Sequence, residues 1–254
     1  MSSRPDTTHQ DTPKLVFVVP YRDRELQLGL FRSHMAKVLE DEPSYEIFFV
    51  HQQDKRTFNR GAMKNIGFLA MKERYPKTYG DITFVFNDID TMPYVKNFLP
   101  YATTEGVIKH FYGFSFCLGG MVSITGKDFE KTKGFPNFWS WGYEDNALQQ
   151  RANAANIRVD RSHFYPIMDG RIIHLQDGPK RIVNEIERKR YDWKTSEGFA
   201  DITKLQYTIE EDMIQVTGFQ TPHPENAHKQ REHDIRSKQN PFAKQKTFMR
   251  MQLR

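Results

Sequence analysis

Three short apolar runs, separated by segments with helical spacing, constrain the fold of this chain more than any other feature. The runs are residues 14–20, 45–50 and 82–86, and continuous runs of β-branched and aromatic residues are typical of strands buried on both faces. Between them, residues 25–40 and 59–74 carry apolar residues at near-helical spacing. This alternation predicts an α/β fold with a mainly parallel central sheet flanked by helices, whose ligands bind at the carboxyl ends of the strands.

The second half of the chain is less regular. We predict a strand over residues 121–125, a helix over 127–133, a helix over 144–156, a short strand over 157–160 and a charged helix over 178–193. There is no dinucleotide fingerprint or P-loop pattern to mark the sheet as a dinucleotide or ATP binder. Residues 1–13 and 219–254 are polar and contain proline, which predicts largely disordered tails around a catalytic domain over residues 14–218.

The excess positive charge lies in the C-terminal tail. The chain has 37 Lys and Arg against 32 Asp and Glu, and residues 221–254 hold eight basic and three acidic residues, which leaves 29 of each sign elsewhere. A balanced body lacks the basic excess that binding to a phosphate backbone requires, so we expect no specific nucleic-acid partner. The basic tail could make a weak contact with an anionic membrane, although an ordinary solvated tail is the simpler interpretation.

Cysteine usage and the N-terminal sequence predict a soluble protein of a reducing compartment. Cys117 is the single cysteine and cannot form an intramolecular disulfide. The first residues lack the apolar core of a signal peptide, and no stretch is long and apolar enough to span a bilayer.

Two aspartates follow the third predicted strand directly. If the backbone stays extended, Asp88 and Asp90 lie on the same face, because side chains of a strand alternate. A divalent cation with a phosphate-bearing ligand commonly stabilises such a pair. An Asp-rich turn that caps the strand is an equal alternative on spacing alone.

Basic and aromatic residues follow the first two predicted strands. Arg22 and Arg24 could face phosphates, or could form ordinary surface ion pairs. Asn59 is placed to cap the second helix, where Phe58 could stack on a base and Arg60 could contact a phosphate.

Residues 134–146 combine aromatic rings with an acidic pair. Tryptophans and phenylalanines beside Glu144 and Asp145 are typical of a carbohydrate site. The alternative is a structural aromatic loop whose carboxylates serve the first turn of the next helix through its dipole. His174 follows a strand-like run, and a lone histidine is more often a core residue than a ligand.

Taken together, these segments resemble the β-1,4-galactosyltransferase family. The resemblance covers about residues 14–210, and the motifs occur in the family's order: Pro-Tyr-Arg-Asp-Arg at 20–24, Phe-Asn-Arg at 58–60 with Asn-Ile-Gly-Phe at 65–68, Phe-Val-Phe-Asn-Asp-Ile-Asp at 84–90, Gly-Gly at 119–120 and Trp-Gly-Tyr-Glu-Asp at 141–145.

The resemblance implies a GT-A (nucleotide-diphospho-sugar transferase) fold and a manganese-dependent, inverting glycosyltransferase. Such an enzyme moves galactose, N-acetylgalactosamine or another hexose from a UDP-sugar donor to a hydroxyl of a glycan or glycoconjugate acceptor. A catalytically inactive module that binds sugar or UDP on the same fold is the alternative.

The resemblance also implies roles for the residues at the family's motif positions. Asp145 would be the catalytic base and Glu144 would grip the acceptor sugar, while Asp90 and His174 would hold the metal ion. The donor-binding residues would be Pro20, Arg22, Arg24, Phe58, Arg60, Asp88, Asp90, Cys117, Gly119, Gly120, Trp141 and Gly142. The acceptor-binding residues would be Trp141, Tyr143, Glu144, Asp145 and Asn146.

Several positions depart from the family pattern. Cys117 stands where vertebrate members commonly have tyrosine, and its smaller side chain could admit an N-acetylated donor. Asn146 replaces an aspartate on the acceptor side, and Arg171 and Gln176 replace a methionine and a histidine that some members have near the metal. Animal members are Golgi-anchored and contain disulfides, whereas this sequence shows a single cysteine and no predicted anchor. We therefore expect this chain to be a soluble cytoplasmic enzyme, of microbial or viral origin.

Overall fold

The strands and helices predicted for the first half form in the expected chain order. The computed structural model describes residues 12–175, 178–237 and 241–242. In its first half the elements are β1 (Leu15–Tyr21), α1 (Glu25–Val38), β2 (Tyr45–Gln52), α2 (Arg60–Arg74), a 3-10 turn (Tyr79–Asp81), β3 (Thr83–Asn87), β4 (Thr91–Pro93), β5 (Val107–Gly113) and β6 (Met121–Thr125). The predicted N-cap is confirmed, since the side chain of Asn59 accepts a hydrogen bond from the amide of Ala62.

The second half adds helices and short strands around this frame. They are α3 (Gly126–Thr132), α4 (Glu144–Ala154), β7 (Arg158–Asp160), β8 (Tyr165–Pro166), β9 (Ile172–His174), β10 (Lys180–Asn184), α5 (Glu185–Asp192), a 3-10 turn (Phe199–Asp201), β11 (Thr203–Glu210), β12 (Met213–Gln220), a 3-10 turn (Ala227–Lys229), β13 (Gln230–Asp234) and a 3-10 turn (Ile235–Ser237).

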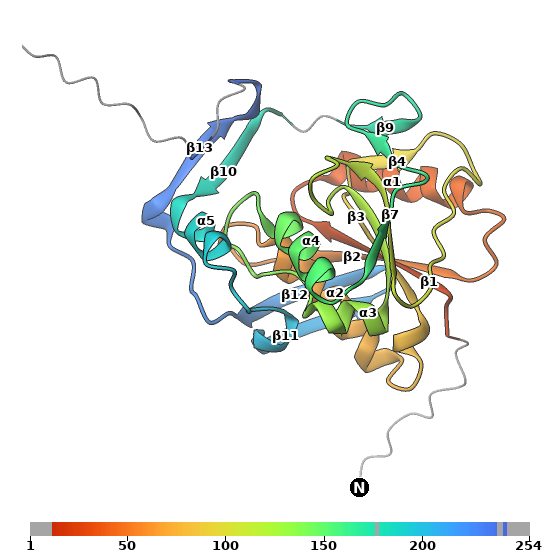
Figure 1. Ribbon diagram of the computed structural model, residues 1–254, viewed down its shortest axis with the longest axis horizontal. Coiled ribbons are helices and arrows are strands. Elements are labelled where there is room, and N and C mark those ends of the chain that lie inside the picture. Colours follow the sequence, from red (N-terminus) through yellow and green to blue (C-terminus); the bar gives the residue numbers. More distant parts are fainter. Residues whose placement is uncertain (1–11, 176–177, 238–240, 243–254) are drawn as a thin grey trace, which may run out of the picture.

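The central sheet is mainly parallel, and β6 and the end strand β11 run antiparallel to their neighbours. Its strand order is β11-β12-β2-β1-β3-β6-β5-β7, with β8 also paired to β5. Strands β12, β2, β1 and β3 run parallel, whereas β6 is antiparallel to both β3 and β5. The predicted α/β architecture with a mainly parallel centre is therefore confirmed (Figure 1).

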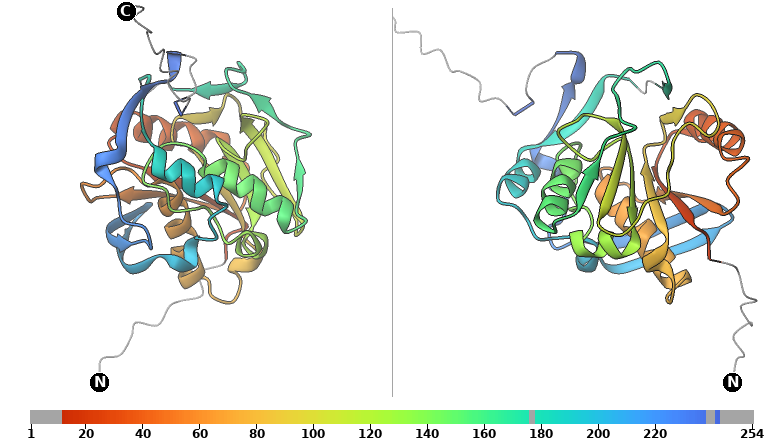
Figure 2. Two further views of the ribbon diagram at one scale, coloured as in Figure 1. Left: turned by 60° about the vertical axis from the view of Figure 1, so that its left-hand side comes forward. Right: turned by 45° about the vertical axis from the view of Figure 1, so that its right-hand side comes forward.

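Helices cover both faces of the sheet, and β1 shows why. Val16 and Val18 belong to the core cluster of α2, while Phe17 and Val19 belong to the cluster of α1 that includes Phe31. Successive side chains of a strand point to opposite faces, so a strand that is apolar throughout needs a helix on each side. The helices α1 and α2 lie on opposite sides of the central strands (Figure 2).

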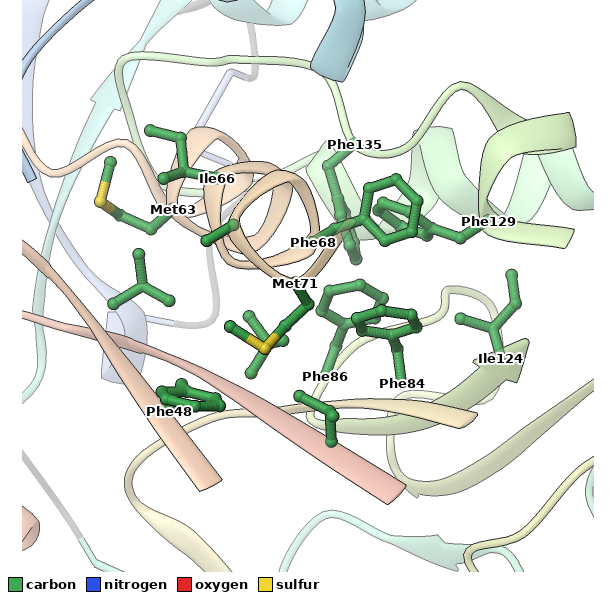
Figure 3. Packing of buried hydrophobic residues seen from close by; sticks show 14 of the residues in the cluster. Phe48, Met63, Ile66, Phe68, Met71, Phe84, Phe86, Ile124, Phe129 and Phe135 are labelled. Atoms are coloured by element: carbon green, nitrogen blue, oxygen red, sulfur yellow. The ribbon is translucent and has the colours of Figure 1, made fainter. Parts of the chain in front are cut away.

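Helix α2 packs especially close to the sheet through aromatic side chains. Phe68 contacts Phe84 and Phe129 with ring centroids 5.0 and 4.8 Å apart (Figure 3). A Cβ atom at Gly67 would lie only 2.4 Å from a methyl of Val18, so any larger residue would push the helix away from β1. This close packing fixes the start of α2 relative to the carboxyl ends of the strands.

Two predictions for the C-terminal third are wrong. Residues 178–193 do not form one helix, because β10 precedes α5 and pairs with β13, and Asn184 caps α5 by accepting from the amide of Ile186. Figure 1 shows this two-stranded ribbon of β10 and β13 beside α5, apart from the central sheet.

The expected limits of the folded domain are also wrong at both ends. Residues 219–237 are not disordered: Phe219 stacks on the buried Trp139 at 5.3 Å, and the Trp139 indole donates to the carbonyl of His223. At the other end, the hydroxyls of Thr12 and Thr78 are hydrogen-bonded at 2.7 Å. The predicted tail segments 1–11 and 243–254 lie outside the described residues. Within the described part of the chain, no helix combines the length and apolar character needed to cross a membrane.

Candidate active site

A pocket of about 410 Å³ opens where β1 and β3 end and α2 begins. Eight of the predicted donor-binding residues line it: Pro20, Arg22, Arg24, Phe58, Arg60, Asp88, Asp90 and Trp141. Residues that sequence analysis did not single out complete the lining: Lys55, Arg56, Thr57, Ile89, Lys180, Arg181 and Ile182. The pocket therefore lies at the carboxyl ends of parallel strands, where α/β sheets bind ligands.

The lining of the pocket is strongly basic. It contains seven lysines and arginines against two aspartates, which suits a ligand with more than one negative charge. The Arg22 guanidinium donates to the carbonyl of Arg56 at 2.6 Å and lies over the Phe58 ring, 5.2 Å from its centroid. These contacts hold the arginine and the ring at the pocket wall in one arrangement.

Beneath the pocket lies a buried cluster of three carboxylates and two cations. Arg60 binds Asp88 at 2.7 Å, and its Nε lies 3.6 Å from Oε1 of Glu144. The ammonium of Lys64 lies 3.1 Å from Oδ1 of Asp145 and 3.8 Å from Oδ1 of Asp88. The residues implied for donor binding, acceptor binding and catalysis thus meet in one ionic network.

The pKa values of Glu144 and Asp88 shift in opposite directions. Burial, assisted by the negative charge of Asp145, raises the pKa of Glu144 above its ordinary value. Burial also acts to raise the pKa of Asp88, but Arg60 and Lys64 outweigh it and the net shift is downward. Oδ1 of Asp88 and Oε2 of Glu144 are buried without a hydrogen-bond partner among the described residues, so both can accept hydroxyls of a ligand.

The N-terminus of α4 positions the acidic pair. Tyr143 precedes the helix in the left-handed region, with φ of 73°, and Glu144 and Asp145 form the first turn. The two carboxylates suit the helix dipole, and they also face the cations of the cluster. The preceding segment is tied to α2, since the Asn65 amide donates to the carbonyl of Phe135 at 2.7 Å.

Outside the pocket lining lie three further predicted donor residues, namely Cys117, Gly119 and Gly120. A Cβ atom at Gly119 would lie 2.3 Å from Oδ2 of Asp145, so only glycine leaves room for that carboxylate. Gly120 accepts from the amide of Asp88 at 2.9 Å. Cys117 is buried, and burial together with Asp145 raises the pKa of its thiol to about 12. A thiol in this state is inert at neutral pH.

Three of the predicted acceptor and loop residues also lie outside the pocket lining. Gly142, with φ of +102°, links Trp141 to Tyr143. Tyr143 stacks on Tyr191, with ring centroids 4.8 Å apart. Asn146 is partly exposed in the first turn of α4.

Asp90 and His174 are brought together by strand pairing. Strands β4 and β9 are antiparallel, and the amide of Leu175 donates to the carbonyl of Asp90 at 2.8 Å. As a result, Nε2 of His174 lies 4.0 Å from Oδ2 of Asp90, while its Nδ1 lies 2.9 Å from the Tyr112 hydroxyl. An imidazole nitrogen and a carboxylate oxygen at this separation, with the other ring nitrogen engaged, fit two ligands of one divalent ion.

The chain supplies few further ligands for such an ion. In the described ranges, no group of three or more His, Cys, Asp and Glu side chains is arranged to hold a metal. Arg171 binds Asp169 at 2.8 Å, and Gln176 lies outside the described residues. The expected extended backbone from Asp88 to Asp90 is wrong, because a turn follows β3, with the amide of Thr91 donating to Asp88.

Sequence analysis missed two residues that bind the predicted ones, namely Lys64 and Tyr112. Lys64 could have been noticed, since it is a lysine in a predicted helix that carries the apolar residues Met63 and Ile66 close by. Nothing in the pattern of β5 distinguishes Tyr112 from an ordinary core tyrosine.

Comparison with known proteins shows the family of this chain. Residues 3–100 match the family described as the N-terminal region of glycosyl transferase group 7, and residues 106–176 match the N-terminal domain of galactosyltransferase. This chain belongs to the group 7 glycosyltransferases. Together the two matches run from before β1 to the predicted metal ligand His174.

Curated relatives of this group 7 glycosyltransferase are galactosyltransferases. The chain is 32% identical over 179 residues to xylosylprotein 4-beta-galactosyltransferase of Caenorhabditis elegans. This alignment covers 66% of this chain and 60% of that protein. It is 28% identical over 223 residues to beta-1,4-galactosyltransferase 2 of Cricetulus griseus, covering 81% and 57% respectively. The chain thus spans little more than half the length of these relatives.

Solved structures share the fold. The catalytic domain of Drosophila beta-1,4-galactosyltransferase 7 in complex with xylobiose superposes with a TM-score of 0.66 at 20% identity, covering 84% of this chain and 96% of that one. A mutant of the same Drosophila protein, in complex with manganese, UDP-Gal and xylobiose, superposes with a TM-score of 0.63 and the same coverage. The GT-A fold implied by the sequence is confirmed.

Proposed function

We propose that this chain is a metal-dependent inverting glycosyltransferase that moves galactose or a related hexose from a UDP-sugar to a hydroxyl of a carbohydrate acceptor. The observation that carries the proposal is the junction of a basic pocket with a carboxylate cluster, since Arg60 and Asp88 belong to both. A diphosphate suits the basic wall, and a sugar suits the unpartnered carboxylate oxygens beneath it. Family membership and the ligands of the Drosophila neighbour support the same assignment.

The donor would lie along the basic wall. Arg22 and Phe58 would flank the uridine, and the other basic side chains would offset the charge of the diphosphate. The buried Oδ1 of Asp88 would accept a hydroxyl of the donor sugar.

Asp90 and His174 would hold the divalent ion, and manganese is the ion we propose. When bound, the ion would offset the charge that builds on the departing diphosphate. Tyr112 would orient the imidazole through its contact with Nδ1.

On the acceptor side, Glu144 would bind the sugar and Asp145 would act as base. The acceptor hydroxyl would pass its proton to Asp145 as its oxygen attacks the anomeric carbon, opposite the departing UDP. Burial of this cluster excludes water, which strengthens each electrostatic contact within it.

The identity of the donor sugar rests on Cys117. The small side chain lies behind Asp145 rather than in the pocket lining, and we propose that it leaves space for a donor with an N-acetyl group at C2. Galactose and N-acetylgalactosamine are therefore the two donors to compare.

Calorimetric binding of UDP, UDP-galactose, UDP-N-acetylgalactosamine and UDP-glucose, with manganese and with EDTA, tests the donor site. We expect binding that depends on manganese and prefers one sugar, followed by transfer to a sugar acceptor. Binding without any transfer across a panel of acceptors would indicate the inactive binding module instead. Absence of binding in both conditions would reject the proposed function.

A further inference from the structure

Lys64 is a buried charge in a helix that is otherwise packed against the sheet. Its residue exposure is 1%, and its neighbours Met63, Ile66 and Gly67 in α2 are buried as well. Lysine is almost never fully buried unless it is paired, because an isolated ammonium in the core costs several kcal/mol. The position therefore requires an explanation in terms of its partners.

The partners of Lys64 come from the acceptor side and the donor side of the proposed site. Its Nζ lies 3.1 Å from Oδ1 of Asp145 and 3.8 Å from Oδ1 of Asp88, and 4.7 Å from the centroid of the Phe135 ring. Burial acts to lower the pKa of Lys64, but Asp145 and then Asp88 outweigh it, so the net shift is upward and the ammonium stays charged. The lysine is the direct link between the two carboxylates.

Other charged groups also face Asp145. Glu144 precedes it in α4, and Arg60 and Asp88 approach from α2 and the end of β3. The thiol of Cys117 lies on the remaining side and stays protonated. Lys64 is the one cation of this set in hydrogen-bonding contact with Asp145 among the described residues. Without Lys64, Arg60 would still pair with Asp88 and Glu144, but no other cation among the described residues forms an ion pair with Asp145.

Gly119 limits the space available to Oδ2 of Asp145. A Cβ there would meet Oδ2 of Asp145 at 2.3 Å, while Oδ1 points to Lys64. The carboxylate is thus held between a backbone contact and an ammonium, which leaves it few alternative orientations.

We propose that Lys64 is a positioning residue for glycosyl transfer, holding the carboxylate of Asp145 in place for the acceptor hydroxyl and coupling it to Asp88 on the donor side. The inference rests on the proposed function. In the transfer, the hydroxyl proton goes to Asp145 and the oxygen bonds to the anomeric carbon. The bond from that carbon to the diphosphate breaks, and its electron pair leaves with UDP. Lys64 keeps its proton throughout.

The test compares Lys64→Met with Lys64→Arg. Methionine has a similar length, carries no charge and can pack on Phe135, whereas arginine keeps the charge. For Lys64→Met we expect manganese-dependent UDP binding within a few fold of wild type and kcat lower by about tenfold or more. The KM for the acceptor should change by a few fold at most, because the lysine holds the base and does not bind the acceptor. Lys64→Arg should restore most of the lost kcat.

A double variant shows whether the lysine acts through Asp145. If it does, Lys64→Met should lower kcat no further in an Asp145→Asn background, since residues that act as a unit are not additive. Additive losses, or a wild-type kcat in Lys64→Met, would overturn the inference. A lysine with a purely structural role would lower thermal stability and leave the kcat of the folded protein unchanged.

Two controls separate this inference from the proposed function. If wild-type protein transfers no sugar, the proposed function fails before Lys64 is tested. If the wild type is active and Lys64→Met does not fold, Lys64→Gln carries the same kinetic measurement, because glutamine keeps a donor without the charge.

Discussion

Asp90 and His174 face each other across paired strands, with Nε2 of His174 4.0 Å from Oδ2 of Asp90. If they hold a divalent ion, Asp90→Ala should remove manganese-dependent UDP binding and leave only a weak, EDTA-insensitive component. Calorimetry with and without manganese measures this. Asp81→Ala is the matched control, since Asp81 is exposed and pairs with Lys127. Tight manganese-dependent binding by the Asp90 variant would place the ion elsewhere.

Tyr112 tests the same proposed metal site through its contact with His174. Its hydroxyl lies 2.9 Å from Nδ1 of His174 and accepts from the amide of Met168 at 3.2 Å. Tyr112→Phe should keep the packing of the ring and remove both hydrogen bonds. We expect manganese affinity to fall by about 10- to 100-fold, as for other groups that orient a metal-bound histidine. A manganese titration of UDP binding measures the effect, and unchanged affinity would argue against His174 as a ligand.

Asp145 can be tested as the base by Asp145→Asn. The amide keeps the shape of the side chain but cannot accept the proton from a hydroxyl. We expect kcat to fall by about 100-fold or more while manganese-dependent UDP binding changes little. Transfer assays and calorimetry on the same preparation measure both quantities. A variant with wild-type turnover would assign the base to another residue.

Phe219 tests whether the C-terminal segment belongs to the fold. It is 4% exposed and stacks on Trp139, and the Arg56 guanidinium lies 4.4 Å from each of the two rings. Phe219→Ala should lower the free energy of unfolding by about 3 to 5 kcal/mol. Phe116→Ala is the control, because Phe116 is 66% exposed and should change stability little. Urea unfolding compares them, and equal small effects would contradict the packing.

His110 should make stability depend on pH. Burial, assisted by Arg161, lowers the pKa of this histidine to about 4. Its Nε2 lies 3.0 Å from the carbonyl of Gly119, and Arg161 donates to Nδ1, so the folded protein favours the neutral ring. The unfolded chain binds the proton near pH 6.5.

Stability from His110 is therefore complete above about pH 6.5 and is lost as pH falls toward 4, by about 3 kcal/mol over that window. Urea unfolding from pH 7 to pH 4 should show a shallower loss in His110→Gln than in wild type. Parallel curves for the two proteins would show that His110 does not carry this dependence.

The strands and helices of the first half could be predicted from the sequence, because each has a pattern of apolar residues within its own segment. The apolar runs that became β1, β2 and β3 are buried on both faces, and the helices between them have amphipathic spacing. Strand β5 was not predicted, since Lys109 and His110 interrupt its apolar character. The sequence predicts a helix where β10 forms, because local pattern cannot show that its pairing partner β13 lies about fifty residues later in the chain.

The sequence by itself determined which residue types stand at the carboxyl ends of the parallel strands, and hence the basic wall with Arg22, Arg60 and Asp88. Tertiary structure decided which of these residues meet. The pairing that brings His174 to Asp90 and the burial of Lys64 against Asp145 both depend on contacts between segments distant in the chain. Charge pairing and desolvation arise only when such segments pack together, so no local pattern encodes them.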